Sequence, residues 1–231
     1  MAMTDPPISP LRAGSPLRTP RAAAVAGVIF SVFLTAALVL LRLSVPATPG
    51  VPGSWLTDPH QRAEVTIALN LVPFAGIAFL WFIGVLRDRI GEREDRFFAT
   101  VFLGSGLIFV AMIFVAAAIS GGLIGAETSS PPDAGTLALG RMVTATLLNV
   151  YAMRMAAVFT LTTVTIARRT EIVSRWLTLA GFVSALVLLI GVGFSPWLEL
   201  LFPAWILALS IDILTAGLRP PVGAVAPVHQ E

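Results

Sequence analysis

MVTATLLNVYAMRMAAVFTLTTVTIA, residues 142–167, is the stretch that decides the fold, because Arg154 is its only charged residue. At a rise of 1.5 Å per residue, a helix of this length crosses a hydrocarbon layer of about 30 Å. An arginine inside a bilayer is costly, and it faces the interior of a helix bundle, where it finds a partner. The stretch therefore predicts a membrane helix whose charge is satisfied by another helix.

The rest of the chain repeats this apolar pattern. Of 231 residues, 56% are hydrophobic and 12% are charged, about half the charged fraction of soluble domains. Four runs contain no charge at all: residues 22–41, 65–86, 97–126 and 176–198. Two more qualify with charges inside, residues 137–167 and 196–218. The chain is predicted to be an all-α polytopic membrane protein, a bundle of six transmembrane helices at about residues 22–43, 65–86, 97–120, 138–167, 176–195 and 197–217.

The arginines set the predicted orientation. One side of the predicted membrane carries Arg12, Arg18, Arg21, Arg87, Arg89, Arg93, Arg96, Arg168, Arg169, Arg175 and Arg219, whereas the opposite loops carry Arg62. The positive-inside rule then places both termini in the cytoplasm and the protein in the cell (inner) membrane. Residues 1–20 are rich in proline and form a predicted disordered cytoplasmic tail, residues 21–218 form the transmembrane domain, and residues 219–231 form a short second tail. A cleavable signal peptide at the first apolar run is an alternative that would leave five spans.

Composition removes several classes of chemistry. The chain has no cysteine, so disulfides and thiol nucleophiles are excluded. All 15 basic residues are arginine, and without lysine no Schiff base can form. The two histidines, His60 and His229, lie far apart in the sequence and predict no metal site. We expect no cofactor and no metal, and because the net charge is only +2, no nucleic-acid partner.

The start of the second span has capping signals, and its interior has a candidate hinge. Asp58 is the predicted N-cap, with Pro59 as the first helical residue and Gln61 as the partner in a capping box. Pro73 then falls inside the helix, one turn after Asn70, which predicts a kink with a free carbonyl. The kink is either a hinge or an ordinary membrane proline.

The intramembrane charges suggest two ion pairs. The fourth and sixth predicted spans run in the same direction, and the interval from Arg141 to Arg154 equals that from Glu199 to Asp212, about 20 Å along a helix. If these helices are neighbours in register, Arg154 meets Asp212 inside the bundle and Arg141 meets Glu199 near the outer surface. Glu199 also suits the first turn of its helix through the helix dipole, and Arg141 also suits lipid headgroups.

Three interpretations of Arg154 and Asp212 stay open. The two residues form a structural ion pair that fixes helix register, or they line a polar site with Tyr151 and Asn149 that binds an anion or a proton. In the third, no pair forms and Arg154 extends towards the membrane boundary. Helical spacing favours Tyr151 over Asn149 as a neighbour of Arg154.

A resemblance covers the middle third of the chain. Residues 70–114, with the segment RDRIGEREDRFF at residues 87–98, resemble uncharacterised multi-pass membrane proteins of high-GC bacteria. The resemblance implies a membrane protein and no activity.

No span offers a nucleophile, a base and an orienting group together, so we expect a protein without catalytic activity. The leading hypothesis is an interaction or accessory component of the membrane, whose partners are the lipid bilayer and a membrane protein or a second copy of the chain. The alternative is a small transporter or channel that uses the region of Arg154 and Asp212.

Overall fold

The computed structural model describes residues 19–44, 58–90, 96–129, 131–170, 174–191 and 195–216, and these residues are helical almost throughout, with no strand. The predicted tails fall outside this part of the chain, apart from the first two residues of the first helix. The helices are α1 (Thr19–Ser44), α3 (Pro59–Ile90), α4 (Arg96–Ser129), α5 (Ala134–Thr146), η2 (Leu147–Ala152), α6 (Met153–Thr170), α7 (Arg175–Ile190), η3 (Pro196–Leu200) and α8 (Leu201–Ala216).

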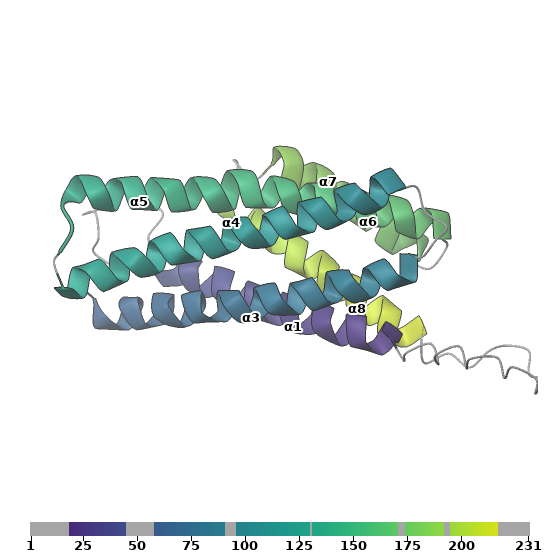
Figure 1. Ribbon diagram of the computed structural model, residues 1–231, viewed down its shortest axis with the longest axis horizontal. Helices are drawn as coiled ribbons and strands as arrows, with labels where there is room; N and C mark the ends of the chain where they lie inside the picture. The colour runs from purple at the N-terminus through teal and green to yellow at the C-terminus, as the bar shows by residue number, and fades with distance from the viewer. Residues whose placement is uncertain are drawn as a thin grey trace, which may run out of the picture.

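The helices form an elongated bundle (Figure 1). α5, η2 and α6 follow one another without a break, and η2 is a π-helical turn inside this long rod. α1 packs on α3 and α8, while α6 packs on α4 and α7. The end of α3, the end of α6 and the start of α7 lie on the right in Figure 1. These helix ends carry Arg87, Arg168 and Arg175, and we call this end of the bundle the arginine-rich end. The α4–α5 connection lies at the opposite end.

Within the described part of the chain, five helical stretches are long and apolar enough to cross a membrane: Ala22–Ser44, Pro59–Arg87, Phe97–Glu127, Ala134–Arg168 and Trp197–Thr215. They are the helices of a multi-pass membrane protein. The fifth predicted span, residues 176–195, corresponds to α7, which has 16 residues and ends at Gly191. At 1.5 Å per residue α7 is about 24 Å long, shorter than the hydrocarbon layer.

Phenylalanine side chains fill the centre of the bundle. Phe79 is fully buried, and its ring centroid lies 4.4 Å from that of Phe30, 5.0 Å from Phe159 and 5.4 Å from Phe109. These rings come from α3, α1, α6 and α4, so a single cluster joins four helices. Lipid tails are as apolar as these side chains, so packing contacts rather than hydrophobic transfer hold such a core together.

Two glycines permit close helix contacts. A Cβ added at Gly27 of α1 would collide with the Ser210 hydroxyl of α8 and would lie 2.9 Å from the Phe82 ring of α3. A Cβ at Gly181 of α7 would collide with Val164 and would lie 2.6 Å from the indole nitrogen of Trp205. That indole donates a hydrogen bond to the Leu177 carbonyl at 3.3 Å, which fixes α8 against α7.

The helix starts show which capping predictions were correct. The backbone N–H of His60 donates to the Asp58 carboxylate at 2.9 Å, which confirms Asp58 as the cap of α3. Asp133 caps α5 in the same way, accepting from the Thr136 N–H at 3.0 Å. Hydrogen bonds from the Thr136 backbone and then its hydroxyl hold the pKa of Asp133 below its ordinary value of 3.8.

α3 continues through Pro73, and Asn70 and Pro73 both lie on its exposed surface. The proposed hinge at these two residues stays a prediction.

Candidate functional site

The predicted pair of Arg154 and Asp212 is not formed. Arg154 is exposed on the surface of α6, and its Nη1 donates to the Val150 carbonyl of its own helix at 3.0 Å. Asp212 is half-buried on α8 and makes no ion pair with a described residue. The pair was inferred from matched depth alone, but thirteen residues turn an α-helix by about 220° net at 3.6 residues per turn. Arg141 and Arg154 therefore lie on different faces and cannot both meet one neighbouring helix.

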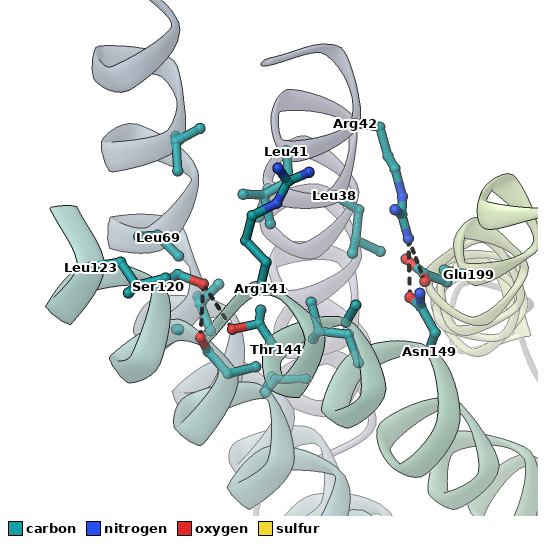
Figure 2. A pocket seen from close by; sticks show the side chains of 18 residues that line it. Leu38, Leu41, Arg42, Leu69, Ser120, Leu123, Arg141, Thr144, Asn149 and Glu199 are labelled. Carbon is teal, nitrogen blue, oxygen red and sulfur yellow. Dashed lines mark hydrogen bonds and ion pairs between the residues drawn. The ribbon is translucent and has the colours of Figure 1, made fainter. Parts of the chain in front are cut away.

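The predicted pair of Arg141 and Glu199 is also wrong, because Glu199 pairs with Arg42. Arg42 Nη2 lies 2.6 Å from Glu199 Oε1 and donates a second hydrogen bond to Asn149 Oδ1 at 3.1 Å. Figure 2 shows Arg42 pointing towards both partners, whereas no interaction joins Arg141 to them. We call Arg42, Asn149 and Glu199 the polar cluster.

Three local features of the backbone build this cluster. Arg42 occupies the last turn of α1 and directs its guanidinium group towards η2 and η3 (Figure 2). Glu199 lies in the 3₁₀ turn η3, which Pro196 begins. Asn149 lies in η2, and a π-turn carries more residues per turn than an α-helix, which changes the direction in which the following side chains point. π-turns within α-helices occur frequently at functional sites.

The carboxylate of the polar cluster is almost completely buried, so its charge is costly unless it is paired. The Glu199 side chain is 1% exposed and that of Arg42 is 28% exposed. Glu199 Oε1 accepts from Arg42, but Glu199 Oε2 is buried and has no hydrogen-bond partner among the described residues. A buried carboxylate depends strongly on its paired cation, because removing the cation leaves a charge that water cannot reach.

A cavity of about 270 Å³ lies beside the cluster, between α1, α3, α4 and the α5–η2 segment. Its wall is mostly aliphatic, with Leu38, Val72 and Ile113 among the lining residues. The polar groups that reach it are Arg42, Ser120, Arg141, Thr144, Asn149 and Glu199. Small-molecule sites in proteins have this composition, a largely apolar wall with a few placed polar groups, at volumes from about 300 Å³.

Arg141 is the charged residue of this cavity that has no partner among the described residues. It is half-buried and makes no hydrogen bond or ion pair with a described residue. The nearby Ser120 and Thr144 hydroxyl oxygens are 3.4 Å apart. With one carboxylate against two guanidinium groups, the cavity has an excess of one positive charge.

The remaining predicted site residues do not join this group. Tyr151 is 54% exposed, and its expected position beside Arg154 stays a prediction, whereas Asn149 enters the polar cluster through its contact with Arg42. The sequence argument also overlooked Arg42, although Arg42 is the only charged residue of the first predicted span. That isolation within an apolar run was the available signal.

The described residues contain no group of three metal-ligating side chains. Comparison of the chain with known protein families, with curated proteins and with solved structures found no match.

Proposed function

We propose that this protein is an integral protein of the cell (inner) membrane, with six membrane helices and both termini in the cytoplasm, that binds a small molecule without catalysing a reaction. In this role it acts as an accessory component of the membrane. The sixth crossing requires α7, whose short length local thinning of the bilayer compensates.

The cavity beside the polar cluster carries the proposal. It combines an apolar wall, an arginine with no partner among the described residues, and an ion pair whose glutamate is buried. Buried ionisable groups are rare in membrane helices and mark binding sites or pathways. The cavity side chains include no cysteine, histidine or lysine, and its serine hydroxyl has no base beside it, so binding accounts for these residues better than catalysis does.

Native mass spectrometry of the protein, extracted gently from its own membrane, tests the proposal. We expect a retained small molecule that is absent from Ala117→Leu, because Ala117 is a half-buried residue of the cavity wall and leucine there fills the space. Ala118→Leu is the matched control, since Ala118 is an exposed neighbour that does not line the cavity. A wild-type protein without a bound molecule, or equal occupancy in Ala117→Leu, contradicts the proposal.

Transport is the second candidate function. The polar cluster lies inside the bundle and is therefore a better location for a transport site than the region of Arg154 and Asp212. Flux of the retained molecule in proteoliposomes separates the two functions. Under the accessory role, the protein binds the molecule without moving it across the bilayer. Flux that is lost in Arg42→Met and kept in Arg154→Met establishes transport instead.

A further inference from the structure

The charge of the cavity points to the chemistry of its occupant. Arg42 is neutralised by Glu199, with Nη2 and Oε1 2.6 Å apart. Arg141 lines the same cavity with no described partner. A half-buried guanidinium favours an anion, because charge-assisted hydrogen bonds are stronger where water is scarce. One negative charge on the occupant balances the site.

Part of the apolar wall of the cavity lies deeper in the bundle than Arg141. Arg141 lies about 40 Å from Arg168 along its helical rod, whereas Val72 lies about 22 Å from Arg87 along α3 and Ile113 about 26 Å from the start of α4. The unpaired arginine is therefore at the end of the cavity away from the membrane centre, and the aliphatic floor is deeper. An occupant that meets both has a charged head and an apolar body.

The volume limits that body. At about 30 Å³ per water-sized group, 270 Å³ holds roughly nine such groups. That is one short chain or a small ring system, and a two-chain phospholipid does not fit inside.

We infer that the cavity binds a single-chain amphipathic monoanion, with a carboxylate or phosphate at Arg141 and an apolar body of roughly eight to ten carbons against Val72 and Ile113. This inference rests on the proposed binding function. Two sources supply the same chemistry, a soluble amphipath or the headgroup and one partly inserted chain of an anionic lipid.

Titration calorimetry with octanoate on the whole protein in phosphatidylcholine nanodiscs tests the inference, with empty nanodiscs as the blank. We expect one octanoate per protein and no saturable binding of octylamine. Arg141→Gln lowers the affinity for octanoate about tenfold or more, which is the loss expected for one charge-assisted hydrogen bond. Arg154→Gln is the matched control, because Arg154 is an exposed arginine outside the cavity, and it leaves the affinity unchanged.

A second variant tests the contact with the apolar part of the ligand separately from the contact with its charged group. Ala117→Leu keeps every charge, fills the apolar part of the cavity and abolishes saturable octanoate binding. Phosphatidylglycerol is then added to the nanodisc lipid. If it competes with octanoate, the natural occupant is a lipid of the membrane, and if it does not compete, the occupant is a soluble amphipath.

Octanoate that binds equally to wild type and Arg141→Gln, or octylamine that binds as well as octanoate, overturns the inference. If wild type retains a molecule from the native membrane and Ala117→Leu does not, the proposed binding function is kept and only the ligand class is wrong. If Ala117→Leu changes neither retention nor octanoate binding, both proposals are wrong.

Discussion

Replacing Arg42 by methionine tests the energetic role of the polar cluster. Methionine keeps the apolar stem of the side chain but removes the only cation that contacts Glu199 among the described residues. Removing one partner of a buried ion pair costs about 3–5 kcal/mol. Since the Arg42 side chain is 28% exposed, we expect about 3 kcal/mol, the lower end of that range.

A double-mutant cycle isolates the interaction. Glu199→Gln leaves Arg42 with access to water and costs about 1 kcal/mol, a typical net hydrogen-bond loss. In the double variant no charge is stranded, so its destabilisation is smaller than the sum of the two single destabilisations by about 2 kcal/mol. The assay is reversible unfolding in mixed micelles, followed by tryptophan fluorescence and circular dichroism.

Arg154→Met is the matched control, because this exposed arginine bonds only to its own helix. It costs less than about 0.5 kcal/mol, as surface changes do, and shows no coupling to Asp212→Asn. Equal costs for Arg42→Met and Arg154→Met, or a coupling near zero between Arg42 and Glu199, refute the reasoning.

Three further predictions concern packing and capping. Gly27→Ala forces a methyl group into the α1–α8 contact and lowers the free energy of unfolding by about 1–3 kcal/mol, whereas Gly84→Ala, with open space around it, does not destabilise; the same unfolding assay compares them. Phe79→Ala empties the centre of the ring cluster and costs about 3–5 kcal/mol, and a cost no larger than that of the exposed Trp81→Ala contradicts the described core. The pKa of Asp133 is lowered in the folded protein, so its cap stabilises the fold at pH values above the ordinary pKa of 3.8. This contribution is lost as the pH falls below that value. Asp133→Asn keeps a cap acceptor that does not titrate, so its unfolding midpoint declines less steeply in acid.

The helical layout was predictable because lipid leaves few alternatives. A backbone that crosses hydrocarbon must satisfy its own hydrogen bonds, so a long uncharged run specifies a helix almost by length alone. The start of α3 was also predictable, since Asp58 and Pro59 form a local signal. The length of α7 was not: residues 176–198 are uncharged throughout, yet the helix ends at Gly191.

The candidate site could not be predicted in the same way. An ion pair depends on the face of each helix as well as on depth, and rotation accumulates over thirteen residues. The π-turn η2 changes the phase again before Arg154, and sequence periodicity assumes a regular α-helix. The 3₁₀ turn places Glu199 beside Arg42 through a backbone geometry that its residue spacing does not reveal. The sequence shows which charged residues lie within the predicted spans, but it did not predict which of them pair.

The central claim is that the polar groups at the Arg141 end of the cavity lie towards the side of the membrane opposite the arginine-rich end. The chain has no cysteine, so a single Thr144→Cys substitution places one thiol in the cavity wall. Val150→Cys, on the exposed surface of the same rod, and Arg175→Cys, at the arginine-rich end, are the controls.

A membrane-impermeant maleimide added to intact cells is the measurement. The account predicts labelling of Thr144→Cys from outside, no labelling of Val150→Cys, and labelling of Arg175→Cys only after the cells are opened. Labelling of Arg175→Cys in intact cells, or a Thr144→Cys thiol that stays unreactive from outside, contradicts it.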